Sequence, residues 1–226
     1  GPVTIDGTTQ PGYPGAPIIT IYRGSLAIDG GNCEITGLRI AGNGEGDGVS
    51  LRSDGNILRG NVIDAFARGV WIDGSDNTIG GVSVPEWNDI MWNGTGVYVN
   101  AGTGNAIRVN SIHHNTNLGI DLSPGGVTAN DAGDVDTGAN MLQNYAVVSQ
   151  AVTHVAATTV TGTLDSSPNT TFLIDCYMSD SCHADGYGGG LLYLGTSSVS
   201  TNESGFVSFA FDTPYPSIVG WQLTTT

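Results

Sequence analysis

A repeat in the first half of the chain is the feature that most restricts its fold. Four consecutive segments, 32–55, 56–76, 77–104 and 105–125, each begin with Asn and continue through an aliphatic residue and a polar turn to a second aliphatic residue. Their period of about 19 to 28 residues is typical of solenoids, which stack one supersecondary unit on the next. The N-terminal stretch "VTIDGTTQPGYPGAPIITIYRGSLAIDGG" indicates one further unit, entered through a Pro/Gly turn.

Aliphatic residues recur at i and i+2 within these segments, which predicts short strands rather than helices. The aligned aliphatic positions are Ile40, Ile63, Ile90 and Ile112, followed by the pairs Val49/Leu51, Val70/Ile72, Val97/Val99 and Ile120/Leu122. One coil cannot bury its own apolar side chains, but stacked coils can. We therefore predict an all-β fold that begins with a right-handed parallel β-helix of about five short coils. Its Asn residues Asn32, Asn56, Asn77 and Asn105 are expected to form one hydrogen-bonded ladder.

The second half of the chain has a different pattern. From "QNYAVVSQAV" to "IVGWQLTTT", short alternating stretches are separated by Ser, Pro, Asn and Gly. This spacing is typical of an antiparallel β-sandwich. We expect a β-helix over 1–126, an acidic junction loop over 127–142, and a sandwich over 143–226. The chain stops at its sixth predicted strand, one short of a seven-stranded sandwich, which would leave an open edge. We expect either that the sequence is cut short or that a neighbouring chain supplies the missing strand.

The charge excludes some partners. The formal net charge is −15, and the basic residues are arginines confined to positions 23–108. Binding to nucleic acid is disfavoured because its phosphates would be repelled. No apolar run approaches the length of a membrane span, so we expect no membrane insertion. Cations, neutral glycans and basic protein surfaces remain as partners.

Several stretches carry a resemblance to a known family. They are "TIDGTTQPGYPGAPIITI", "NTIGG" and the block 119–211, which contains "GIDLSPGGVTANDAGDVDTGANMLQNYAVV". The chain resembles large bacterial surface proteins in which right-handed parallel β-helix repeats precede an Ig-like β-sandwich module. That resemblance covers nearly the whole chain. It implies an Ig-like sandwich and a secreted or cell-surface location, and it implies no established activity.

Outward residues of the repeats suggest a glycan site. Threading the coils places Ser50, Trp71, Tyr98 and Asp121 in one column, with the two aromatic rings side by side. Trp92, with Trp87, falls on an adjacent turn. Aromatic faces flanked by Asp and Asn suit sugar rings, so we predict glycan binding by Trp71, Tyr98, Trp92 and Asp121. The alternative is that another segment covers these rings.

A second group suggests catalysis. Asp64 and His113 share a column, Asp89 lies two residues away from it, and His114 follows directly. Paired carboxylates are what glycoside hydrolysis needs, and a carboxylate with a base would suit polysaccharide β-elimination. Asp64, Asp89 and His113 are thus the catalytic candidates. The alternative is that these residues lie in ordinary solvent-exposed turns, where Asp and His also occur.

The stretch "VTANDAGDVDTGAN" is the strongest candidate for a cation site. Asn130, Asp131, Asp134 and Asp136 offer hard oxygen ligands within a loop broken by Gly, and Ca²⁺ takes such ligands. The stretch fails the EF-hand template because no bidentate Glu follows. An acidic cap whose Asp side chains bond to nearby backbone N–H groups is the alternative.

The cysteines allow two interpretations. Cys176 and Cys182 are far enough apart to turn and pair, which predicts a disulfide. The alternative is a buried thiol at Cys176 and an exposed one at Cys182, with Cys33 a small core residue.

Together these patterns predict an extracellular or cell-surface structural or adhesive module. We expect it to bind glycans or other surface proteins, to be stabilised by Ca²⁺, to need no organic cofactor, and to assemble as a fibre subunit by strand exchange. The alternative is an enzyme, a polysaccharide lyase or glycoside hydrolase acting on the outer face of the β-helix.

Overall fold

A computed structural model describes residues 1–183, 186–216 and 220–226. It divides the chain into two compact units. The first contains Gly1–Val127 and Gly138–Asn140, and the second contains Thr128–Thr137 and Met141–Thr226. The predicted junction, 127–142, is therefore shared between the two units.

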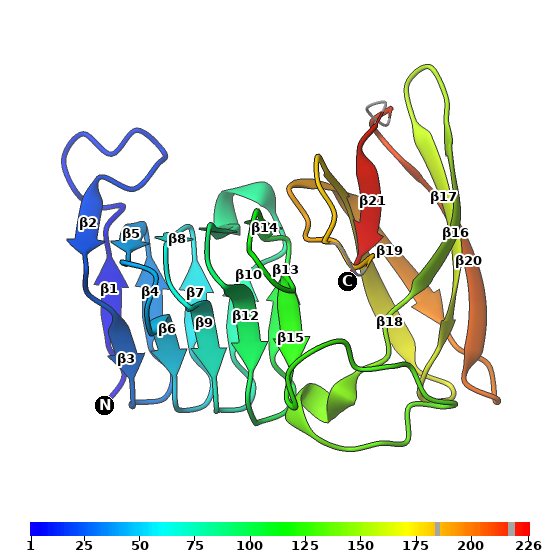
Figure 1. Cartoon of the computed structure of the whole chain (residues 1–226), viewed down its shortest axis with the longest axis horizontal. Helices are drawn as coiled ribbons and strands as arrows, with labels where there is room; N and C mark the ends of the chain where they lie inside the picture. Colours follow the sequence, from blue (N-terminus) through cyan, green and yellow to red (C-terminus); the bar gives the residue numbers. More distant parts are fainter. Residues whose placement is uncertain (184–185, 217–219) are drawn as a thin grey trace. The chain divides into compact units, whose positions relative to one another are not determined.

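The first unit is a parallel β-helix whose coils stack along the chain from blue to green in Figure 1. Three parallel sheets, each 5-stranded, form its sides. The first sheet contains β1 (Thr4–Asp6), β4 (Glu34–Thr36), β7 (Ile57–Arg59), β10 (Thr78–Gly80) and β13 (Ala106–Arg108). The second contains β2 (Ile19–Tyr22), β5 (Leu38–Ala41), β8 (Val62–Asp64), β11 (Asp89–Met91) and β14 (Ser111–His113). The third contains β3 (Leu26–Ile28), β6 (Asp47–Leu51), β9 (Arg68–Ile72), β12 (Thr95–Val99) and β15 (Ile120–Leu122).

The register confirms the predicted alignment of the repeats. Ile63 pairs with Ile40 on one side and Ile90 on the other, and Val70 pairs with Val49 and Val97. Each of these six side chains is fully buried. The N-terminal stretch forms the expected additional coil through β1, β2 and β3. In the part of the chain that the structure describes, two 3-10 helices interrupt the strands, η1 (Val84–Glu86) and η2 (Ala139–Leu142).

Buried asparagine side chains form hydrogen-bonded ladders along the turns of the coils. The prediction that one ladder begins at Asn32 was wrong for this first residue. Cys33 occupies the ladder position in that coil, where its N–H donates to Asn56 Oδ1 at 2.9 Å. From there Asn56, Asn77 and Asn105 each donate a backbone N–H to the amide oxygen of the next ladder residue, and the last acceptor is Asn140. The end of the predicted junction therefore completes the ladder.

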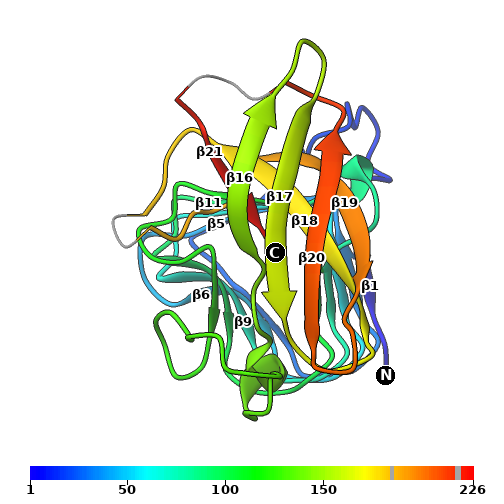
Figure 2. The same ribbon diagram turned by 90° about the vertical axis from the view of Figure 1, so that its right-hand side faces the viewer.

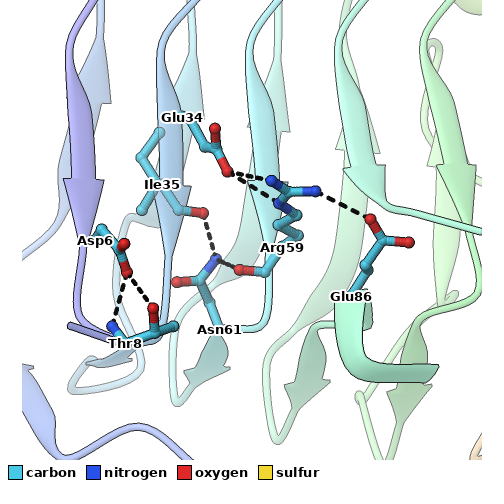
Figure 3. A network of polar contacts seen from close by, with 7 residues as sticks. All are labelled: Asp6, Thr8, Glu34, Ile35, Arg59, Asn61 and Glu86. Carbon is cyan, nitrogen blue, oxygen red and sulfur yellow. Dashed lines mark hydrogen bonds and ion pairs between the residues drawn. The ribbon is translucent and has the colours of Figure 1, made fainter. Parts of the chain in front are cut away.

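Two more ladders follow the other turns. Asn61 donates to Asn88, and Asn88 donates to Asn110, at 3.1 Å for both backbone N–H bonds. Asn93 donates to Asn115 at 3.0 Å. The Asn side chains also donate to carbonyls of neighbouring coils, as Asn61 Nδ2 does to Ile35 O at 2.9 Å (Figure 3). Backbone groups at each turn thus find partners without water.

Ion pairs cross the same face of the coils. Arg59 bridges Glu34, at 2.6 Å from Nη2 to Oε1, and Glu86, at 3.0 Å from Nη1 to Oε1 (Figure 3). At the first coil, Asp6 Oδ1 accepts from the backbone N–H and hydroxyl of Thr8. The ion pairs of Arg59 with Glu34 and Glu86 link three successive coils through partly exposed side chains. At the surface such ion pairs contribute less to the free energy of unfolding than the buried amide hydrogen bonds do.

The described residues of the second unit form two antiparallel sheets, each 3-stranded. One has the order β16 (Val147–Thr153), β17 (Thr158–Asp165), β20 (Phe206–Thr213) and faces the viewer in Figure 2. The other has the order β19 (Leu192–Ser200), β18 (Thr171–Ser179), β21 (Gln222–Thr225). Side chains of both sheets share one hydrophobic core. Positions 218 and 219 of the last predicted strand lie outside the described residues.

The predicted Cys176–Cys182 disulfide is wrong. Both cysteines are free thiols in the described part of the chain. Cys176 lies in β18 with its side chain inside the shared core and 0% exposed, whereas Cys182 is exposed beyond the end of the strand. Burial raises the pKa of the Cys176 thiol to about 12, so this thiol stays protonated and serves as a small apolar core residue.

Removing one ladder amide should destabilise the β-helix strongly. Asn88 is 0% exposed, and its Oδ1 accepts from both the backbone N–H and the Nδ2 of Asn61. Asn88→Ala would leave these buried donors unpaired at about 1–3 kcal/mol each. We expect chemical denaturation to show a loss of at least about 2 kcal/mol. Asn117→Ala, at an exposed position, is the matched control and should change stability by less than about 0.5 kcal/mol. Equal stability of the two variants would contradict a structural role for the ladder.

Candidate functional site

The acidic loop of the second unit brings three of its carboxylates together. Oxygen atoms of Asp131, Asp134 and Asp136 all lie within 4.8 Å of one another. In the described residues, this is the one group of three or more His, Cys, Asp or Glu side chains with ligand atoms so close together. The sequence from Thr128 onward contains no Lys or Arg, so the second unit itself supplies no strong base to neutralise the group.

The loop is held in place by residues that follow it in the chain. Asn144 is buried, its Nδ2 donates to the carbonyls of Asp131 at 2.6 Å and Asp165 at 2.7 Å, and its Oδ1 accepts from the N–H of Asp131. Gly133 N–H donates to Asp165 Oδ1 at 2.9 Å, which ties the loop to the end of β17. These anchors fix where the carboxylates point before any ligand arrives.

The carboxylates differ in how their oxygens are used. Asp134 accepts at Oδ1 from the N–H of Asn144 and at Oδ2 from Ser166 Oγ at 2.6 Å and Gln143 Nε2 at 3.1 Å. Asp131 Oδ2 accepts one long bond of 3.3 Å from the N–H of Val135.

Two oxygens of the cluster have no partner. Asp131 Oδ1 and Asp136 Oδ1 are buried, and neither has a hydrogen-bond partner among the described residues. Desolvation raises the pKa of Asp136, and the nearby charges of Asp131 and Asp134 raise it further. Buried polar atoms in native proteins normally have a partner, so these two oxygens call for a water molecule, a proton or a cation between the carboxylates.

Asn130, the fourth predicted ligand, has a different role. Its Nδ2 donates to Tyr145 O at 2.8 Å, and its Oδ1 accepts from Tyr145 N–H at 3.0 Å. The side chain therefore holds the entry of the loop to Tyr145, two residues before β16. Gln143, Asn144, Ser166 and Asp165 were not predicted from the sequence, although Gln143 and Asn144 directly follow the acidic stretch.

The predicted aromatic column forms on the third sheet of the β-helix. Ser50, Trp71, Tyr98 and Asp121 are consecutive partners in register. The rings of Trp71 and Tyr98 stack on each other, with centroids 5.0 Å apart and an interplanar angle of 20°. The Arg68 guanidinium lies over the Trp71 ring at 4.1 Å, and Gly126 N–H donates to Asp121 Oδ1 at 3.0 Å.

This column is therefore partly covered from within the β-helix. Arg68 and Tyr98 occupy faces of the Trp71 ring, and burial raises the pKa of Asp121. Trp71 Nε1 donates to Asp73 Oδ2 at 2.8 Å. Trp92 lies apart from the stack, is 61% exposed, and packs against His114.

The predicted catalytic residues separate into two groups on the second sheet. Asp64 faces Met91 in register, and Met91 faces His113. Asp64 pairs instead with Arg39, at 2.9 Å from Nε to Oδ2. Asp89 Oδ1 lies 2.9 Å from His113 Nε2, and His113 Nδ1 lies 2.6 Å from His114 Nδ1. The structure thus joins Asp89 and His113 but gives Asp64 a different partner.

Comparison with known proteins agrees with the architecture. A family model described as a right handed beta helix region matches residues 23–204, which is well over half of the chain. The chain belongs to the right-handed β-helix family. No curated protein matches it. A β-helix fold accommodates many activities, so the function of this family member has to be argued from its sites.

The described residues of this β-helix protein include no helix with the length and apolarity needed to cross a bilayer.

Neutralising Asp136 should have opposite effects with and without a cation. The raised pKa of folded Asp136 means that the folded state is favoured below the unfolded pKa and loses this advantage as pH rises through the folded pKa. In metal-free buffer at neutral pH, Asp136→Asn should therefore melt higher than the wild type and depend less on pH. When Ca²⁺ is added, the melting temperature of the wild type should rise, whereas that of the variant should not. Glu203→Gln, at an exposed position outside the loop, is the control and should follow the wild type in both buffers.

Proposed function

We propose that this protein is an extracellular structural or adhesive module whose second unit is stabilised by a calcium ion bound to Asp131, Asp134 and Asp136. The observation that carries the proposal is the pair of buried, unpartnered oxygens on Asp131 and Asp136. A cation between the carboxylates would satisfy both oxygens and remove the repulsion among the three charges.

The ligand chemistry favours Ca²⁺ over other ions. The cluster offers only carboxylate oxygens, which suit hard cations, and lacks the Cys and His that transition metals prefer. Ca²⁺ accepts six to eight oxygens in irregular geometry, whereas Mg²⁺ demands a near-ideal octahedron. A loop that supplies three carboxylates, one of them engaged by hydrogen bonds at both oxygens, fits the more tolerant ion.

The order of strands in the second unit supports an Ig-like interpretation of this module. With strands named in chain order, β16, β17 and β20 correspond to A, B and E, and β19, β18 and β21 correspond to C′, C and F. These are the neighbours that such strands have in an Ig-like sandwich. Modules of this kind are common in cell-surface proteins, which is consistent with the proposed extracellular role.

Calcium should raise the melting temperature of the second unit. Extracellular calcium modules bind with a Kd of roughly 0.1–1 mM, so 10 mM Ca²⁺ would add about 1.4 to 2.7 kcal/mol to the free energy of unfolding. Differential scanning calorimetry in Ca²⁺ and in EDTA measures this. Asp131→Asn should abolish the shift, and Glu203→Gln should retain it. Identical melting of the wild type in the two buffers would remove the calcium proposal.

For the adhesive role, we propose Trp92 as the aromatic group that contacts a glycan. It is 61% exposed, and one face of its ring rests on His114 at a centroid distance of 4.7 Å. The position aligned with Trp92 in the preceding coil is Ala65, as the register of β8 with β11 requires, and its methyl group leaves room beside the ring. The Trp71 and Tyr98 rings are less suited, because they stack on each other beneath Arg68.

Trp92→Ala should weaken binding to a glycan selected on an array by about tenfold, since loss of one aromatic stacking contact costs about 1.5 kcal/mol. Titration calorimetry measures the affinity. Tyr22→Ala removes an aromatic ring that is 70% exposed in the first coil, and it should bind as the wild type does. Equal loss in both variants, or in neither, would contradict the assignment of Trp92.

Polysaccharide cleavage by β-elimination is the second candidate function. The Asp89–His113 hydrogen bond of 2.9 Å favours it, because a carboxylate that orients an imidazole is a common general-base arrangement. Glycoside hydrolysis is less supported, since Asp64 is paired with Arg39 rather than facing a second carboxylate. Release of unsaturated products from a glycan that the protein binds would replace the adhesive proposal with this one.

A further inference from the structure

We propose that the glycan bound at Trp92 is an acidic one, and that Arg23 binds its carboxylate or sulfate group. This inference rests on the glycan-binding role proposed for Trp92 and is independent of the calcium proposal. It adds the chemical class of the ligand, which an aromatic ring alone does not specify.

One turn position of the β-helix recurs in every coil and places the residues of this site in a row. The position directly follows the strands of the second sheet, whose last residues are register partners: Tyr22, Ala41, Asp64, Met91 and His113. The row itself consists of Arg23, Gly42, Ala65, Trp92 and His114. The N–H groups of Arg23 and Gly42 donate to Ala41 O at 2.7 Å and Asp64 O at 2.8 Å, so the pairing of the strands continues into the turn.

The two positions beside the free face of Trp92 carry no bulky side chain. His114 stacks on one face of the Trp92 ring at a centroid distance of 4.7 Å, which is one coil spacing. On the other face, the next residues of the row are Ala65, with a methyl group, and Gly42. A Cβ atom added at Gly42 would lie 2.2 Å from Ala65 O, so the backbone itself excludes a side chain there. A sugar ring can therefore lie above Ala65 and stack on Trp92.

Arg23 ends the row, three coils before Trp92. Its side chain is exposed and makes no ion pair with the residues that the structure describes. The guanidinium lies 5.5 Å from the ring centroid of Tyr22. At an exposed position this contact is weak, so the N–H groups of Arg23 remain available. A guanidinium binds carboxylate and sulfate groups through two parallel hydrogen bonds, which favours an acidic ligand.

The spacing of the coils is consistent with one ligand that reaches both residues. A sugar ring stacked on Trp92 lies at the level of Ala65, and two coil spacings, roughly 10 Å, separate that level from the backbone of Arg23. The long Arg side chain and an acid group on the same sugar or the next one together cover this distance.

The acidic residues that flank the row are mostly engaged. Asp64, which directly precedes Ala65, is paired with Arg39 at 2.9 Å, and Asp89 is bonded to His113 at 2.9 Å. Glu45, three residues after Gly42, is exposed and opposes an acidic ligand. Removing its charge therefore tests the sign of the charge on the ligand.

The test uses the full chain and three oligosaccharides of equal length, one with glucuronate, one sulfated and one neutral. Titration calorimetry should show tighter binding of an acidic oligosaccharide than of the neutral one, and this advantage should shrink as salt is added. The glucuronate and sulfated ligands distinguish the two kinds of acid group.

Arg23→Asn should lower the affinity for the acidic ligand by about 10- to 100-fold, because hydrogen bonds to a charged group are lost. It should leave the affinity for the neutral ligand unchanged. Asn tolerates the left-handed backbone of Arg23, whose φ is 54°. Arg52→Asn removes the same charge from an exposed position after a strand of the third sheet. It is the matched control and should bind as the wild type does.

Two further variants act on the same row. Glu45→Gln should raise the affinity for the acidic ligand by about two- to fivefold, as removal of one exposed like charge predicts. Ala65→His should place an imidazole on the free face of Trp92, as His114 covers the other face, and should abolish binding of acidic and neutral ligands alike. The φ of Ala65, 64°, matches those of Trp92, 58°, and His114, 51°, so this turn accommodates the substitution.

The outcomes separate this inference from the proposal on which it rests. If Trp92→Ala abolishes binding but Arg23→Asn binds the acidic ligand as the wild type does, the glycan site stands and its acidic class is wrong. Equal wild-type affinity for the neutral ligand has the same meaning. If no oligosaccharide binds, or Trp92→Ala has no effect, the glycan-binding role itself fails. If Arg23→Asn melts at a different temperature from the wild type, Glu45→Gln decides in its place, and an unchanged or lower affinity would overturn the inference.

Discussion

Buried asparagine amides hold the coils of the first unit in register. A solenoid turn interrupts the strand pairing, so its backbone N–H and carbonyl groups must find partners inside a water-poor stack. An Asn side chain has both a donor and an acceptor and can serve two coils at once, as Asn88 does between Leu58, Asn61 and Asn110. The aliphatic side chains supply apolar burial, but these amides determine that each coil sits directly on the one before it.

The same stacking determines which surface groups can meet. Residues at equivalent positions of successive coils lie about 4.8 Å apart, which is a stacking distance for rings and a short distance for charges. It stacks Trp71 on Tyr98, stacks Trp92 on His114, and lets Arg59 reach acidic residues on both neighbouring coils. The candidate site residues on this unit therefore form columns that run across neighbouring coils.

The acidic loop of the second unit is held differently, by individual hydrogen bonds from residues elsewhere in the chain rather than by a repeated ladder. Asn144 and Ser166 hold the loop in place, and the like charges approach one another without a base in that half of the sequence. The electrostatic cost of that arrangement is the physical reason for the proposed cation. Figure 2 shows the sheet of β16, β17 and β20. Its central strand, β17, ends at Asp165, whose carboxylate accepts from the N–H of Gly133 in the loop.

The sequence by itself determined the β-helix, the alignment of its aliphatic residues, the change of pattern near residue 140, and the column from Ser50 to Asp121. These follow from periodicity, because a repeat constrains every coil in the same way. Only the tertiary structure decided which Asn residues form ladders, that Cys33 replaces the first of them, and that Cys176 is buried as a free thiol. It also decided that Asp64 pairs with Arg39 while Asp89 pairs with His113. Side-chain partners depend on rotamers and on the exact register between neighbouring coils, which places Cys33 and not Asn32 beside Asn56, and periodicity does not specify either.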